Sequence, residues 1–131
     1  DVAQVKLEAL GLNDASATAT RVITIPKGNI NVGGNTNISR NSNVTFSLYA
    51  SNPGSSSSAT DMIGSFQARR NGSNPSAIEI TKELYNKIIA NGGNVYIRFT
   101  ARSGYRTTYY VASAKLSDLM DKGVTLAFTQ Q

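Results

Sequence analysis

A strict alternation of apolar and polar residues over Val95–Ala101 constrains this chain more than any other feature of its sequence. The apolar positions are Val95, Ile97, Phe99 and Ala101. The positions between and after them are Tyr96, Arg98, Thr100 and Arg102. Because side chains alternate across a strand, this spacing predicts a strand with its apolar face in a core and the other face toward solvent.

The same period of two recurs in several shorter segments. They are Arg21–Ile25, Val44–Tyr49, Met62–Ala68, Ile78–Ile80, Arg106–Ala114 and Val124–Phe128. Ile30 and Val32 allow one more short strand. The residues between these segments include Pro26, Asn71-Gly72 and Ser103-Gly104, which are typical of strand ends and turns. The pattern predicts an all-β fold.

One short helix is expected near residues 81–90. Thr81 is a suitable N-cap, Leu84 and Ile88 are spaced i,i+4, and Asn91-Gly92-Gly93 provides a stop. The segment Lys115–Lys122 fits either a loop or a helical turn.

The N-terminal residues alternate more weakly. Val5, Leu7 and Ala9 fall on one side of a possible strand over Val2–Ala9, and a short helix is the competing interpretation. Gly11–Thr20 is small and polar, as a loop would be. We expect residues 1–131 to form a single domain, with residues 1–20 as an N-terminal extension or an edge strand.

Composition argues against most catalytic chemistry. The 131 residues contain neither Cys nor His, so thiol nucleophiles, the commonest general base and the commonest metal ligand are missing. The acidic residues are few and show no paired or calcium-binding spacing. We therefore expect a protein that is not an enzyme and that needs no metal or cofactor.

The segment Ile78–Ala114 resembles the immunoglobulin-like modules that repeat in large bacterial exoproteins and adhesins. It has the short strand Ile78-Glu79-Ile80, a helical turn, Gly92-Gly93 and then the strand that begins at Val95. Val44-Thr45-Phe46 is similar to the earlier core strand of those modules. The resemblance implies an immunoglobulin-like antiparallel β-sandwich, a role in adhesion and a secreted or cell-surface location. The chain departs from those modules in being basic, where they tend to be acidic.

Tyrosine and arginine side chains are concentrated around Gly104. The expected ligand-binding residues are Tyr96, Arg98, Arg102, Tyr105, Arg106 and Tyr109. Tyr and Arg anchor many interfaces because they bring large contact area together with hydrogen bonds, and Arg pairs well with carboxylate, sulfate or phosphate. The alternative is that the tyrosines are core or cross-strand partners and the arginines form a solvated face.

The net charge of +5 favours an acidic partner. We expect a binding or adhesion domain that contacts an anionic glycan or a protein surface, with nucleic acid less favoured. The alternative is a structural subunit of a fibre, pilus or particle, in which Val2–Ala9 and Val124–Phe128 pair with neighbouring copies. A toxin that acts by binding also stays open. No stretch approaches the roughly 20 apolar residues of a membrane span.

Overall fold

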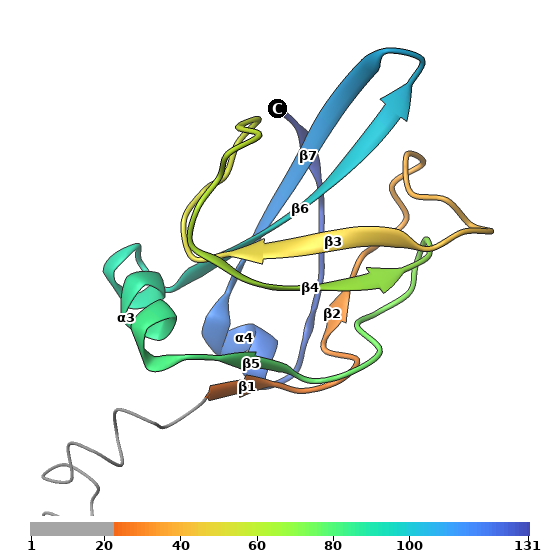
Figure 1. Cartoon of the computed structure of the whole chain (residues 1–131). Helices are drawn as coiled ribbons and strands as arrows, with labels where there is room; N and C mark the ends of the chain where they lie inside the picture. Colours follow the sequence, from red (N-terminus) through yellow and green to blue (C-terminus); the bar gives the residue numbers. More distant parts are fainter. Residues whose placement is uncertain (1–22) are drawn as a thin grey trace, which may run out of the picture.

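The computed structural model describes residues 23–131 (Figure 1), so the expected strand or helix at Val2–Ala9 and the extension 1–20 lie outside the described residues. The described elements, in chain order, are β1 (Ile23–Ile25), β2 (Ile30–Asn31), β3 (Val44–Tyr49), β4 (Met62–Ala68), β5 (Ile78–Ile80), α3 (Lys82–Ala90), β6 (Asn94–Ser103), β7 (Arg106–Lys115), α4 (Leu116–Met120), β8 (Val124–Thr125) and β9 (Thr129–Gln130).

The largest sheet has five antiparallel strands in the order β4-β3-β6-β7-β9. Two hairpins, β3–β4 and β6–β7, supply four of the strands. In the second hairpin the register runs from Asn94 opposite Lys115 to Ser103 opposite Arg106, which leaves a two-residue turn at Gly104-Tyr105. The alternation over Val95–Ala101 therefore marks a central strand that is paired on both sides for part of its length.

Two smaller strand pairs lie at the apolar face of this sheet (Figure 1). β1 pairs with β5 in antiparallel orientation, and β2 pairs with β8 in parallel orientation. Ile25 and Ile80 from the first pair and Ile30 from the second belong to the same buried cluster as Phe46 and Ile97 of the large sheet. The described chain is thus mostly β, largely antiparallel, and closes its strands over one shared core.

Aromatic rings fill the centre of that core. Phe46 stacks on Phe66 with ring centroids 5.3 Å apart, and it also packs against Phe99 at 5.4 Å. Phe128, near the end of the chain, meets the edge of Phe99 at 4.8 Å. Such pairs contribute about 1 kcal/mol each beyond the area that they bury. Phe128 therefore holds the C-terminal segment against the large sheet.

The helix expected near residues 81–90 is confirmed. Thr81 Oγ1 accepts a hydrogen bond from the backbone N–H of Leu84 at 3.4 Å, and the helix packs through the fully buried Ile88. At its other end the N–H of Gly93 donates to the carbonyl of Ile88 at 2.8 Å. Both ends lie where capping chemistry predicts them.

A second helix, α4, corrects the expectation of one helix. Its five residues bury Leu116 and Leu119, spaced i,i+3, and no side chain caps its N-terminus. A single turn leaves too short a pattern to be separated from a loop, so packing against the core decides its conformation.

The expected last strand, Val124–Phe128, is also corrected. Within this region Val124–Thr125 forms β8 and pairs with β2, and a separate strand, β9, follows at Thr129–Gln130 and pairs with β7 at the edge of the large sheet. The N–H of Leu126 donates to the carbonyl of Asn31 at 2.8 Å, after which Phe128 enters the aromatic cluster. The alternation of Val124, Leu126 and Phe128 correctly predicted which side chains point toward the core. It does not indicate which strand these residues pair with.

Within residues 23–131, no helix is long and apolar enough to cross a bilayer.

The close approach of Gly33 to the β8–β9 connection gives a test of this arrangement. A Cβ at Gly33 would lie 2.6 Å from the carbonyl oxygen of Leu126, whereas a Cβ at Gly28 would meet nothing within 4 Å, and both residues have positive φ. Gly28→Ala is expected to lose about 1 kcal/mol of unfolding free energy from backbone strain. Gly33→Ala adds a backbone clash and is expected to lose about 3 kcal/mol. Urea unfolding measures both, and equal losses would contradict the close approach.

Candidate functional site

The register of the β6–β7 hairpin separates the six expected binding residues. Tyr96, Arg98 and Arg102 share the face of β6 that points away from the core, here called the outer face of the sheet. Tyr109 lies opposite Thr100 and so belongs to the same face. The structure thus brings four of the six residues to one face.

The other two residues lie elsewhere on the hairpin. Arg106 lies opposite Ser103 and therefore has the opposite parity to Tyr109. Tyr105 is in the turn, with a relative exposure of 105%. Tyr110, opposite Phe99 on the hairpin, stacks on the Phe99 ring at 5.0 Å and is partly buried against the core. For this tyrosine the alternative interpretation, a core or cross-strand partner, is confirmed.

The end of the hairpin projects beyond the rest of the sheet (Figure 1). β3 pairs with β6 no further along than Arg98, and β9 pairs with β7 at Tyr110 and Val111. Residues 100–108, here called the arm, are therefore a two-stranded ribbon. Arg102, Tyr105 and Arg106 are exposed on it.

Arg98 differs from the other arginines because it is buried. Its relative exposure is 9%, and its guanidinium is enclosed by the segment that follows β3. Nη1 donates to the carbonyl oxygens of Gly54 at 3.1 Å and Ser56 at 2.7 Å, with a longer contact of 3.5 Å to Pro53. Nη2 donates to the hydroxyl of Tyr49 at 3.2 Å.

Two aromatic rings complete the enclosure of this cation. Cζ of Arg98 lies 5.2 Å from the ring centroid of Tyr49 and 4.7 Å from that of Tyr109. Both distances fall within the range in which the ring quadrupole attracts a cation. A planar, delocalised guanidinium suits this position, because it can stack and donate several hydrogen bonds at once.

The burial of Arg98 corrects the expectation that its side chain faces solvent. The prediction that Arg98 lies on the outer face of the sheet is confirmed, but residues 51–58 cover its side chain. In sequence that segment is rich in serine and contains Asn52-Pro53-Gly54, a composition typical of a surface loop. Its carbonyl oxygens are instead the acceptors that a buried cation requires. Arg98 therefore positions the loop and the Tyr109 ring.

A second contact holds the far end of the same segment. Lys87 Nζ of α3 lies 2.6 Å from Asp61 Oδ1, and Ser51 Oγ donates to Asp61 Oδ2 at 3.3 Å. The hydrogen bond from Lys87 holds the pKa of the Asp61 carboxyl below its ordinary value. A lowered folded-state pKa means that the contact is complete at neutral pH and is lost only as the pH falls through that value.

Two shallow pockets flank the covered arginine. The first, of about 370 Å³, contains two of the expected binding residues; its lining is Ser55, Arg106, Thr107, Thr108, Tyr109, Gln130 and Gln131. The second, of about 350 Å³, contains Tyr96; its lining is Asn52, Tyr96, Val111, Ala112, Ser113, Thr125, Ala127, Thr129 and Gln131. We call the first the Arg106 pocket and the second the Tyr96 pocket.

The residues that line the Arg106 pocket carry hydroxyl, amide and guanidinium groups as well as the ring of Tyr109. These groups can hydrogen-bond a polyhydroxylated or anionic ligand, and the ring can lie against an apolar sugar face. In residues 23–131 no group of three or more acidic side chains could hold a metal ion.

Several residues of the site gave no signal in the sequence. Gln130 and Gln131 reach Tyr109 because β9 joins the sheet edge, where the N–H of Gln131 donates to the carbonyl of Tyr109 at 2.8 Å. Ser55 reaches it because Arg98 holds the loop. Tyr49 could have been assigned to the outer face by parity, but its partner in space could not.

Comparison with protein families, with curated proteins and with solved structures gave no match.

The role of Arg98 is tested by removing its hydrogen bonds while keeping its bulk. Arg98→Met leaves three carbonyls and the Tyr49 hydroxyl without their donor, so we expect a loss of about 2–4 kcal/mol in unfolding free energy. Arg102→Met, on the exposed arm, is the matched control and is expected to stay within about 0.5 kcal/mol of the wild type. Urea unfolding at neutral pH compares them. Similar losses in the two variants would show that Arg98 is not a structural cation.

Proposed function

We propose that this chain is a non-catalytic binding module of a secreted or cell-surface protein, and that the Arg106 pocket and the arm bind an anionic glycan. The observation that carries the proposal is that Arg106, Tyr109, Gln130 and Gln131 line one pocket. A guanidinium, an aromatic ring and two amides are the groups that recognise a sugar bearing a carboxylate or sulfate.

Charge supports the same ligand class. The ion pair recorded within residues 23–131 is Lys87–Asp61, so neither Arg102 nor Arg106 has a carboxylate partner among the described residues. Both arginines are exposed, and the whole chain carries a net charge of +5. An anion approaching the arm therefore meets two cations whose charge no described neighbour offsets.

We also propose that the large sheet and the smaller strand pairs form an immunoglobulin-like sandwich of the adhesin type. The support is the order of elements: the β5 strand, the α3 turn, Gly92-Gly93 and the β6–β7 hairpin follow one another as the resemblance implies.

Glycan binding by single-charge variants tests the ligand proposal. Arg106→Ala removes a charge-assisted contact in the pocket and is expected to weaken binding on an array of sulfated and carboxylated glycans by about tenfold or more. Arg69→Ala removes the same charge from an exposed residue outside the hairpin and is expected to leave binding nearly unchanged. Equal weakening by both variants would mean that net charge, and not this pocket, attracts the glycan.

A structural subunit is the second candidate function, and one feature of the arm favours it. The β6 residues beyond Arg98 have no β3 partner among the described strands, so part of the backbone edge is free to pair with another chain. The expected outcome under this alternative is a mass that rises with concentration in light scattering. The binding-module proposal expects a monomer throughout, and an arm-dependent oligomer would count against it.

A further inference from the structure

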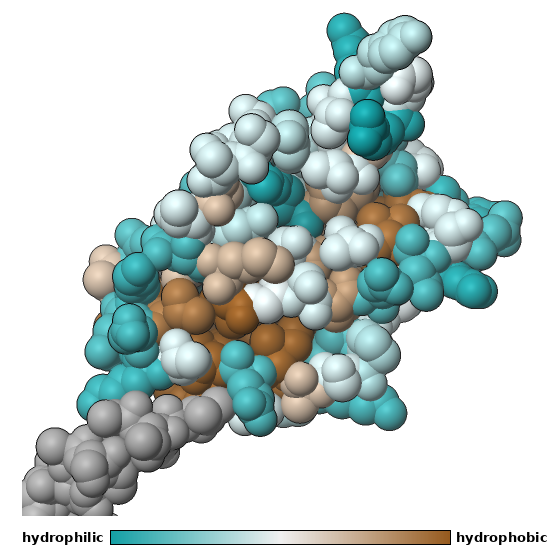
Figure 2. Space-filling model, in the orientation of Figure 1, coloured by the Kyte–Doolittle hydropathy of each residue, from teal (hydrophilic) through white to brown (hydrophobic). Residues whose placement is uncertain are grey.

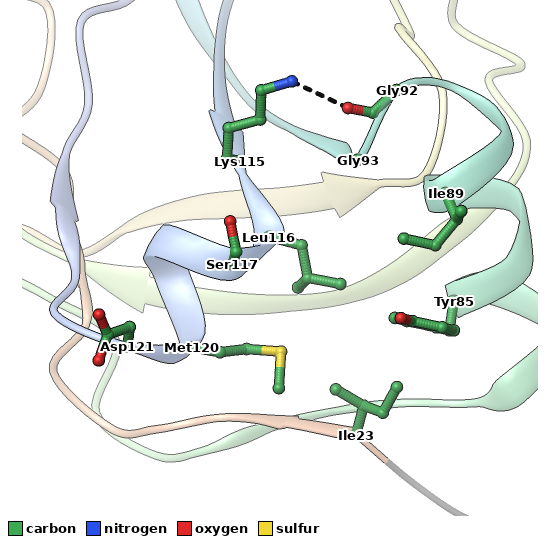
Figure 3. Close-up of a pocket in the computed structure, with 10 residues that line it drawn as sticks. All are labelled: Ile23, Tyr85, Ile89, Gly92, Gly93, Lys115, Leu116, Ser117, Met120 and Asp121. Carbon is green, nitrogen blue, oxygen red and sulfur yellow. Dashed lines mark hydrogen bonds between the residues drawn. The ribbon is translucent and has the colours of Figure 1, made fainter.

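An open groove lies between α3 and α4, at the base of the β6–β7 hairpin (Figure 3). Its volume is about 620 Å³. Five apolar or aromatic side chains from β1, α3 and α4 converge on it: Ile23, Tyr85, Ile89, Leu116 and Met120. Lys115 closes one end, where its Nζ donates to the carbonyl of Gly92 at 2.9 Å.

The groove leaves apolar surface uncovered by the described residues. Ile89 is 51% exposed and Met120 is 38% exposed, on two neighbouring helices. Figure 2 shows the resulting hydrophobic patch between α3 and the β1–β5 pair. Isolated exposed apolar residues are common, but a cluster around a groove is typical of a contact site.

We propose that the chain's own N-terminal segment, Val2–Leu10, occupies this groove. Its apolar residues are Val2, Val5, Leu7, Ala9 and Leu10. Ile23 both lines the groove and begins β1, so the chain preceding β1 joins the described structure at the groove itself.

The length of the connection makes the chain's own segment the favoured occupant. Residues 11–22 separate Leu10 from Ile23, and twelve residues span at most roughly 40 Å when extended. A flexible linker of that length has a root-mean-square span of roughly 20 Å, which sets an effective concentration in the mM range. A hydrophobic contact too weak to hold a free peptide would still be formed by a tethered segment.

A spin label tests the contact directly, because the chain has no cysteine that would compete for labelling. Gln4→Cys, carrying a nitroxide, lies on the polar side of the alternating segment. We expect the label to broaden the methyl resonances of Ile89 and Met120 strongly and that of Thr107, on the arm, much less. No broadening at Ile89 and Met120 would overturn the proposal.

Two controls separate the proposed contact from other occupants. When spin-labelled chains without isotopes are mixed with isotope-labelled chains without the nitroxide, broadening in the mixture would show contact with a second copy and overturn the intramolecular proposal. In the labelled chain, Leu7→Asp and Ile89→Lys should each abolish the broadening. Met62→Lys, at another exposed apolar residue, should leave it intact.

A stability comparison supplies an independent readout. Leu7→Asp is expected to lower the melting temperature by about 4 °C, since it releases a segment packed on the groove. In the Ile89→Lys background, where the groove is already disrupted, the same change should have almost no further effect. Additive losses, or no loss from Leu7→Asp alone, would contradict the proposal.

Discussion

The outer face of the large sheet is organised by the need to satisfy a buried cation. Arg98 has no carboxylate among its hydrogen-bond partners in the described structure. Its charge is offset by dipoles, namely the backbone carbonyls of Pro53, Gly54 and Ser56, the Tyr49 hydroxyl and two aromatic faces. Removing a guanidinium from water is costly unless its donors are paired. If the loop moved away, the N–H groups of the Arg98 guanidinium would lose the carbonyls that accept their hydrogen bonds. This need for acceptors holds the loop on the outer face of the sheet.

The inner face is organised by aromatic packing, and it shapes the site from the other side. Phe128 packs against Phe46 and Phe99, which brings the chain across to the edge of the large sheet. Only then can β9 pair with β7 and place Gln130 and Gln131 beside Tyr109. Two long-range contacts thus form the Arg106 pocket. Arg98 holds the loop that carries Ser55, and Phe128 holds the C-terminal segment that carries Gln130 and Gln131.

The sequence predicted the strands better than their surroundings. The alternation of apolar and polar residues predicted β3, β4, β5, β6 and β7 and assigned Val95, Ile97 and Phe99 to the core. A strand that is buried on one face has apolar residues at every second position, so its sequence shows the pattern. Capping residues located α3 for a similarly local reason. The residues of α4 fit either a loop or a helical turn, since one turn of helix has too few residues to show a period.

For the candidate site, parity on β6 placed Tyr96, Arg98 and Arg102 on the correct face but could not show what covers it. The exposure of Arg98 depends on a loop more than 40 residues away in sequence. The residue types in Ser51–Thr60 do not indicate that the backbone carbonyls of this loop accept hydrogen bonds from an arginine. The early end of β8 at Thr125 and the separate β9 at Thr129–Gln130 could not be predicted for the same reason, because tertiary packing determines the pairing partners. Local pattern thus assigned the candidate binding side chains to a face of the hairpin, and distant contacts determined which of them are exposed.

The NMR spectrum of the Arg98 side chain tests most directly whether this guanidinium is a buried, fixed cation. A guanidinium held by the Gly54 and Ser56 carbonyls, the Tyr49 hydroxyl and two stacked rings cannot rotate freely about its Nε–Cζ bond. We expect separate, slowly exchanging Nη proton resonances for Arg98, with chemical shifts displaced by the ring currents of Tyr49 and Tyr109. Those of Arg102 and Arg106 should stay averaged and exchange quickly with water. An averaged, rapidly exchanging Arg98 signal, indistinguishable from that of Arg102, would contradict this prediction.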